Sequence, residues 1–281
     1  MLLNPFHLHQ PKSLSEAAQA LKDHKGAKLL AGGTFLINQL KQLKKKGLKT
    51  PKEIISLNGI KEMKGFEQNK DTLIIKSLTT IAELVDDKDL FFLRTASQNI
   101  ATTPIRNMAT LGGNLTCRYT WSEMPAVMIA YDAVLHFMGT SGFAEKISAE
   151  DFFNNNARTS NILTHISIKK NAVHQFSYQR VRKTLHLDVP ILTVCIKAEC
   201  DKKIFSNVRV VINSGTHFAQ RDKILEEFLN GIGVSDTNLI KDALENLDNN
   251  IVTNMSNDYK IHMQRICIKN ALIDIIQQAN S

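Results

Sequence analysis

Two pairs of adjacent glycines, Gly32-Gly33 and Gly112-Gly113, constrain this chain more than any other feature. Paired glycines let a backbone turn with positive φ and approach a ligand closely. The first pair stands between an apolar run at residues 28–31, which predicts a strand, and a helical apolar spacing that ends at Gly47. Such a turn exposes N–H groups and a positive helix end to phosphate oxygens. Together the two turns predict a cradle for a dinucleotide; taken separately, each is better explained as a simple tight turn.

The common nucleotide-binding motifs do not fit these turns. Neither is followed by Gly-Lys-Ser/Thr, as a Walker A loop would be, and neither reads Gly-x-Gly-x-x-Gly. Gly231-Ile-Gly233 lacks the third glycine and a preceding strand. The sequence therefore argues against a P-loop enzyme and against a Rossmann domain.

The pattern of elements changes near residue 174. Before it, short strands alternate with helices, and Thr80 with Glu83 predicts a capping box. After it, three strands precede three helices, which indicates a separate α+β unit. The predicted elements before residue 174 are strands at 53–57, 73–78, 134–138 and 162–168 and helices at 11–21, 91–101 and 122–131, the last capped by Ser122. Those after it are strands at 176–181, 190–199 and 207–212 and helices at 222–229, 238–247 and 259–279.

Composition excludes several classes of function. The chain is 43% hydrophobic and 22% charged, which is typical of globular proteins. The net charge of +8 comes with only 6% aromatic residues and no recognition module, so we expect no nucleic-acid partner. The four cysteines lack iron–sulfur spacing and the histidines lack His-x-x-x-His spacing, so we expect no metal ligands on this chain. With no secretory signal and no spanning apolar stretch, a cytoplasmic location is expected.

The surroundings of both turns carry a resemblance. The segment Ile100-Ala-Thr-Thr-Pro-Ile-Arg-Asn-Met-Ala-Thr-Leu-Gly-Gly-Asn-Leu115 resembles the pattern of the flavin subunits of xanthine dehydrogenase, carbon monoxide dehydrogenase and related molybdenum hydroxylases. Further likenesses follow in the family order over nearly the whole chain: Lys28-Leu-Leu-Ala-Gly-Gly-Thr-Phe-Leu36, Leu78-Thr79-Thr80, the segment from Ser122 to Ala133, and Asn161-Ile-Leu-Thr-His-Ile166.

The resemblance implies a fold and a domain organisation. The fold would be α+β, with a two-subdomain FAD-binding domain of the vanillyl-alcohol-oxidase (PCMH-like) type followed by a C-terminal three-stranded antiparallel sheet with helices. The implied boundaries are residues 1–57 and 58–173 for the two FAD-binding subdomains and 174–281 for the C-terminal domain.

The resemblance also implies a cofactor, FAD, and its contacts, with no catalytic residue on this chain. The first turn would wrap the pyrophosphate, the second would supply further backbone donors, Ile100 would pack near the flavin, and Leu163 would offer a backbone contact. Arg180 stands where the family usually has a lysine, and Glu123 where it has an aspartate. The complete expected set is Leu29, Leu30, Ala31, Gly32, Gly33, Thr34, Phe35, Leu36, Ile100, Thr110, Leu111, Gly112, Gly113, Asn114, Glu123, Leu163 and Arg180.

Departures from the family pattern gather at the expected mouth of the cleft. Phe35 replaces a polar residue, and the stretch from Cys117 to Trp121 is bulkier than the small residues usual there. Trp121, the single tryptophan, suits either stacking on a ligand or packing against protein. Arg106 is expected to hold the preceding loop through its several donors.

The function implied is electron transfer. Substrate would be hydroxylated on a molybdopterin-binding large subunit, and electrons would cross a [2Fe-2S] small subunit to FAD here and leave to NAD⁺ or another acceptor. Two alternatives stay open: a non-catalytic interaction subunit of the same complex with weakened FAD binding, and a stand-alone FAD-dependent reductase.

Overall fold

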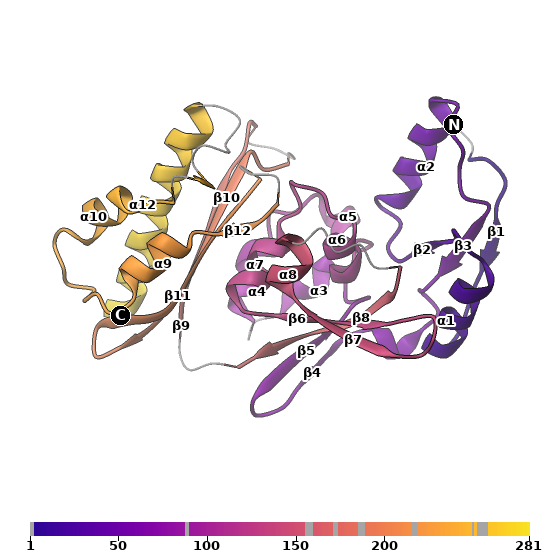
Figure 1. The fold of residues 1–281 in the computed structure, drawn as a ribbon, viewed down its shortest axis with the longest axis horizontal. Coiled ribbons are helices and arrows are strands. Elements are labelled where there is room, and N and C mark those ends of the chain that lie inside the picture. The colour runs from indigo at the N-terminus through magenta and orange to yellow at the C-terminus, as the bar shows by residue number, and fades with distance from the viewer. Residues whose placement is uncertain are drawn as a thin grey trace.

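The chain folds into three units, each built around its own β-sheet. The units follow one another along the molecule in sequence order, so the second lies in the middle (Figure 1). The structure is a computed structural model that describes residues 3–87, 90–154, 160–170, 174–184, 189–214, 218–248, 250–251 and 258–281. The sheets fall inside the three ranges expected for the domains, although the exact boundaries stay a prediction and residues 171–173 lie outside the described residues. Among the described residues, no helix is long and apolar enough to cross a bilayer.

The first unit is a three-stranded parallel sheet with two helices. Its strands are β1 (His7–His9), β2 (Lys28–Leu30) and β3 (Glu53–Ser56), in the order β1-β3-β2. The helices are α1 (Leu14–Asp23) and α2 (Leu36–Lys45). Ser13 caps α1 by accepting a hydrogen bond from the Glu16 N–H at 3.2 Å. The strand–glycine–helix order predicted for this segment is confirmed.

The second unit is a five-stranded antiparallel sheet with short helices. The strands are β4 (Phe66–Gln68), β5 (Thr72–Lys76), β6 (Val134–Met138), β7 (Ala144–Ser148) and β8 (Ile162–Lys169), in the order β4-β5-β8-β6-β7. Helical segments are η1 (Lys61–Met63), α3 (Ile81–Asp86), α4 (Phe91–Ser97), α5 (Thr103–Arg106), α6 (Leu111–Thr116), α7 (Met124–Ala130) and α8 (Ala149–Asn154). Thr80 and Glu83 form the predicted capping box.

The C-terminal unit has a fourth strand that the sequence analysis did not predict. Three long strands are present as expected, but the two-residue β12 (Gln220–Arg221) pairs with the third of them and makes the sheet four-stranded. A two-residue strand carries no periodicity, so the sequence could not reveal it. The other elements are β9 (His174–Val181), β10 (Leu192–Asp201), β11 (Ile204–Asn213), α9 (Lys223–Leu229), α10 (Leu239–Glu245) and α12 (Asp258–Asn280).

This C-terminal sheet is buried on both faces. Alternate residues of a strand point to opposite faces. On β10, Cys195 belongs to the core of the second unit, whereas its neighbours Val194 and Ile196 belong to the core beneath α12. Helix α7 packs on one face and α12 on the other. The sheet therefore joins the C-terminal unit to the second unit through shared hydrophobic packing.

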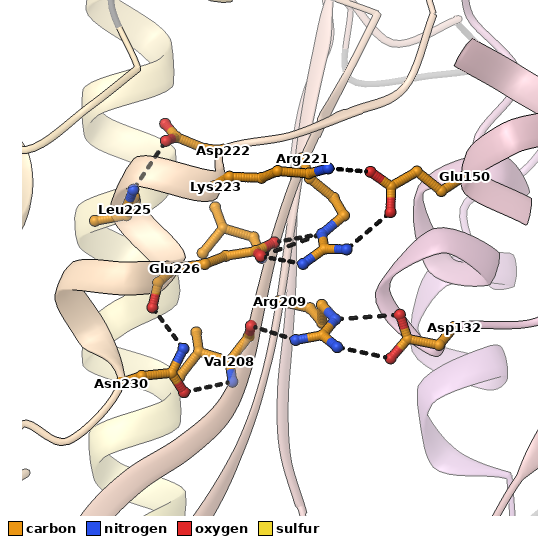
Figure 2. Close-up of polar contacts among 11 residues, drawn as sticks. Asp132, Glu150, Val208, Arg209, Arg221, Asp222, Lys223, Leu225, Glu226 and Asn230 are labelled. Carbon is orange, nitrogen blue, oxygen red and sulfur yellow. Dashed lines mark hydrogen bonds and ion pairs between the residues drawn. The ribbon is translucent and has the colours of Figure 1, made fainter. Parts of the chain in front are cut away.

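Ion pairs at the edge of the same contact also join the two units (Figure 2). The Arg209 guanidinium donates to the Asp132 carboxylate, with Nη2 to Oδ2 at 3.1 Å. Arg221 donates to Glu150 at 2.8 Å and to Glu226 of its own unit. The two pairs between the units, Arg209 with Asp132 and Arg221 with Glu150, are partly exposed, so each contributes about 1 kcal/mol or less, and the apolar packing dominates.

A row of basic side chains crosses the sheet of the second unit and predicts acid sensitivity. His136 and His165 are register partners whose rings stack at 4.1 Å between centroids. Burial, then the neighbouring His136 and Lys76, lowers the pKa of His165 to about 4. Lys146, the register partner of His136 on β7, also opposes protonation, whereas Glu67 favours it.

We expect the free energy of unfolding to fall as the pH drops from about 6.5 to about 4. In that range His165 is protonated in the unfolded chain but stays neutral in the folded chain, so protons favour unfolding. Urea unfolding at several pH values should show that His165→Gln removes on the order of 1 kcal/mol of this loss, since partial exposure weakens the effect. An unchanged pH dependence in the variant would assign the acid sensitivity to other groups.

Candidate functional site

The first glycine turn leaves a helix end without a cap. Gly33 has a φ of 71°, and helix α2 begins three residues later. No side chain caps that helix, and its N-cap position is Phe35. Among the residues that the structure describes, the N–H groups of Gly33, Thr34 and Phe35 donate to no protein acceptor. This turn therefore presents unused donors at the positive end of a helix.

Gly32 brings the first turn against the second unit. A Cβ atom at Gly32 would lie 1.8 Å from the Met108 carbonyl oxygen and 2.7 Å from the Met108 carbonyl carbon. Only glycine allows this approach, because a backbone carbonyl has no alternative rotamer. The turn thus lies directly beside the segment that leads into the second glycine pair.

The second glycine pair differs from the prediction. Gly112 and Gly113 lie inside the short helix α6, and neither has positive φ. Thr110 is the N-cap and accepts a hydrogen bond from the Gly113 N–H at 3.1 Å. A Cβ atom at Gly112 would lie 2.7 Å from Cβ of Ser77, so the glycine permits close packing of a helix on a strand end.

The expectation that residues 110–114 supply free backbone donors is wrong for four of them. The Leu111 N–H donates to Thr79 and the Gly112 N–H donates to Ser77, both at 2.8 Å. The Gly113 and Asn114 N–H groups both donate to Thr110. Because these backbone N–H groups already donate within the protein, residues 110–114 would contact a ligand through their side chains and their shape.

A pocket of about 400 Å³ borders both turns. Gly32 lines it from the first unit and Thr110 from the second, and Lys64 contributes a cation. Its other lining residues are Asn58, Leu78, Thr80, Glu83, Asn107 and Met108. The polar lining suits a polar ligand better than an apolar one, and Lys64 offers a cation for phosphate, whereas the Glu83 carboxylate is held in its capping box with Thr80.

Three of the aromatic residues that depart from the family pattern, Phe35, Tyr119 and Trp121, meet in one aromatic cluster. Phe35 lies 3.9 Å from Tyr119 and 5.5 Å from Trp121, measured between ring centroids. Tyr119 and Trp121 stack at 5.1 Å with an interplanar angle of 23°. All three are half-buried. Through this cluster, Phe35 of the first turn packs against the segment that follows α6.

A chain of polar contacts leads from the second turn into the C-terminal unit. The Ser122 hydroxyl donates to the Asn114 side chain at 2.6 Å, so Ser122 is not the helix cap that was predicted. The next residue, Glu123, accepts from Arg180 Nε at 2.9 Å and from the Tyr178 hydroxyl at 3.0 Å. Burial raises the pKa of Glu123, although both partners act to lower it. Two expected cofactor contacts therefore form one buried ion pair.

The other expected residues lie on elements that support the turns. Leu163 is buried on β8, against which α6 packs. Ile100 is half-buried against the same core. Its carbonyl accepts from Arg106 at 3.0 Å, and the Ala101 carbonyl accepts from Arg106 at 2.8 Å, which confirms the structural role predicted for that arginine.

Several residues of the site were not predicted. Met108 and Ser77 act through backbone oxygens, which have no sequence signal. Asn58 donates to the Ala31 carbonyl at 3.1 Å and so fixes the start of the first turn. Tyr178 could have been found, because it lies two residues before Arg180 and therefore on the same face of β9.

Comparisons with known proteins identify the family to which the chain belongs. Residues 4–169 match the family described as "FAD binding domain in molybdopterin dehydrogenase". That match covers more than half of the chain, so the protein belongs to this family of FAD-binding domains.

Relatives with assigned names are similar over part of their length. The carbon monoxide dehydrogenase medium chain of Hydrogenophaga pseudoflava is 31% identical over 53% of this chain and 52% of its own. The xanthine dehydrogenase FAD-binding subunit of Escherichia coli O157:H7 is 32% identical over 48% of this chain and 46% of its own. The chain thus spans about half the length of these relatives.

A solved structure extends the likeness in fold to the whole chain. A carbon monoxide dehydrogenase from Hydrogenophaga pseudoflava that lacks the Mo-pyranopterin moiety superposes with a TM-score of 0.87 over 98% of both chains, at 23% identity. This likeness extends the mixed α and β fold into the C-terminal unit.

Proposed function

We propose that this chain is the FAD-binding electron-transfer subunit of a molybdenum hydroxylase, taking electrons from iron–sulfur clusters on a partner chain and delivering them through FAD to NAD⁺ or another acceptor. The observation that carries the proposal is the uncapped start of α2 beside the Gly32–Met108 contact. Unused N–H groups at a positive helix end suit the pyrophosphate, and the glycine contact holds this turn close beside the second unit.

The bound flavin supplies the redox chemistry, and the chain supplies binding, orientation and electrostatics. Gly33, Thr34 and Phe35 would hold the pyrophosphate through backbone N–H groups. The rigid second turn and Leu163 would shape the opposite wall. Arg180, held by Glu123, would place a positive charge near the flavin and favour its reduced, anionic form.

The partners follow from chemistry that this chain lacks. Its cysteines show no iron–sulfur spacing, so the [2Fe-2S] clusters belong to a small subunit and the molybdopterin to a large one, both on separate chains. Co-expression with genes for the two proposed partner chains should yield one complex on affinity purification. A chain that reduces acceptors fully without partners would instead be a stand-alone reductase.

The direct test is the flavin content of the purified chain. We expect about one FAD to be released per chain on denaturation, as the one-site geometry requires. A colourless chain that takes up no added FAD would overturn the proposal and favour an interaction subunit. For the acceptor, NADH should bleach the flavin band if NAD⁺ is used in the forward direction; reduction by dithionite alone would point to another acceptor.

Arg180 is tested separately from FAD binding. An Arg180→Ala chain should keep part of its FAD but show a lower flavin reduction potential, because a cation near the reduced flavin is lost. Arg180→Lys, which restores the charge, should recover much of the potential. Normal flavin content and potential in Arg180→Ala would remove Arg180 from this role.

The single tryptophan gives an optical report of cofactor binding. Trp121 lies in one aromatic cluster with Phe35 of the first turn. We expect added FAD to quench most of the tryptophan fluorescence of the apoprotein, since a flavin absorbs where tryptophan emits. Trp121→Phe is the control that should bind FAD without this signal. Stoichiometric FAD binding with unchanged fluorescence would place the flavin away from this cluster.

A further inference from the structure

A group of metal-ligating side chains lies on the first unit, away from both glycine turns. His9 at the end of β1, His24 at the C-cap of α1 and Glu53 at the start of β3 bring their ligand atoms within 4.8 Å of one another. It is the one group of three or more such side chains among the residues that the structure describes. We propose that His9, His24 and Glu53 form a binding site for a divalent transition metal such as Zn²⁺.

The distances are close to what a metal requires. Zn²⁺ binds nitrogen and oxygen ligands at about 2.0–2.1 Å in a tetrahedron, so ligand atoms lie about 3.3 Å apart. Here His9 Nε2 is 2.7 Å and His24 Nδ1 is 3.9 Å from Glu53 Oε2, which straddle that value. The two imidazole rings lie 4.1 Å apart between centroids, tilted by 31°. Small side-chain rotations would complete the coordination.

The chemistry of the group also fits a metal. Two imidazoles and one carboxylate are a ligand set for zinc with the fourth position open to water. A glutamate side chain is ionised at neutral pH, so Glu53 offers a charged oxygen beside the two imidazole nitrogens. The three side chains are partly buried, which limits competition from water without excluding an ion.

The site would act as a clip. Its ligands come from three elements separated by 15 to 29 residues, and among the described strands the three-residue β1 pairs only with β3. A bound ion would tie β1 and α1 to the amino end of β3. The first turn follows β2, at the carboxyl end of the same parallel sheet. A bound ion would therefore stabilise the sheet that carries this turn without contacting a cofactor. The inference therefore stands independently of the proposed function.

The test uses the full chain, free of any histidine tag and dialysed against a chelator. Titration with ZnCl₂ in a calorimeter should show one site per chain and a rise in Tm, because the ion binds the folded state. His24→Ala and Glu53→Gln should each weaken Zn²⁺ binding by about 100-fold, since loss of even an outer-shell partner costs 10- to 100-fold. His262→Ala, an exposed histidine on α12, is the matched control and should bind as the unaltered chain does.

Two further measurements keep the outcome decisive. Far-UV circular dichroism and urea unfolding of the metal-free variants should match the unaltered chain; if His24→Ala does not fold, the near-isosteric Glu53→Gln carries the test. Co²⁺ should give visible bands without a thiolate charge-transfer band, because nitrogen and oxygen are the ligands. Absence of Zn²⁺ binding, equal binding by Glu53→Gln, or a thiolate band would each overturn the proposal.

Discussion

Replacing Gly32 by alanine should abolish FAD incorporation and destabilise the chain by about 1–3 kcal/mol, the usual cost of overpacking a tight site. The added Cβ would lie 1.8 Å from the Met108 carbonyl oxygen, and the next nearest atoms are also backbone, so relief requires the first turn or the Met108 segment to move. Either movement displaces the N–H groups of the turn. Released flavin and urea unfolding measure the two effects.

Gly233→Ala is the matched control for this prediction. The nearest atom to its added Cβ is the Lys203 carbonyl oxygen at 3.8 Å, an ordinary contact. This variant should keep both its FAD and its stability. A Gly32→Ala chain that behaved in the same way would show that the close contact in the first turn is not required.

Replacing Glu123 by alanine should cost about 3–5 kcal/mol, because it leaves the Arg180 charge buried without its carboxylate. The two side chains are 5% and 8% exposed, so water cannot replace the lost partner. The Tyr178 hydroxyl loses its acceptor as well. Urea unfolding should show the loss, and Glu123→Gln, which keeps an acceptor of similar size, should lose less.

The control is an ion pair across the same two units. The Asp132 side chain is 49% exposed and pairs with Arg209, so Asp132→Ala should cost about 1 kcal/mol or less. A Glu123→Ala chain no less stable than Asp132→Ala would mean that Arg180 finds other partners or water after the substitution.

Local sequence patterns predicted the elements well and the contacts between them poorly. The first glycine turn, the Thr80–Glu83 capping box and the structural role of Arg106 depend on residues close in sequence, and all three are confirmed. The second glycine pair was misassigned as a positive-φ turn. Glycine is chosen there because Ser77, distant in sequence, lies against the helix.

Long-range contacts account for the remaining differences. The sequence marked Phe35 and the stretch from Cys117 to Trp121 as unusual, yet nothing in it shows that these aromatic rings meet. Glu123 and Arg180 were expected to bind the cofactor individually, and their pairing appears only when the C-terminal sheet is packed against α7. The His9, His24 and Glu53 cluster likewise escapes a search for ligands at fixed spacing.

The unequal use of backbone amides in the two turns has a consequence for cofactor capture. The amides of residues 111–114 are committed to the protein, whereas those of residues 33–35 are not. The side of the pocket formed by residues 111–114 is therefore fixed by protein hydrogen bonds before any ligand arrives. The first turn is also held in place, by the Asn58 hydrogen bond to Ala31 and by the Gly32–Met108 contact, so its unused N–H groups are preorganised and little chain entropy would be lost on binding.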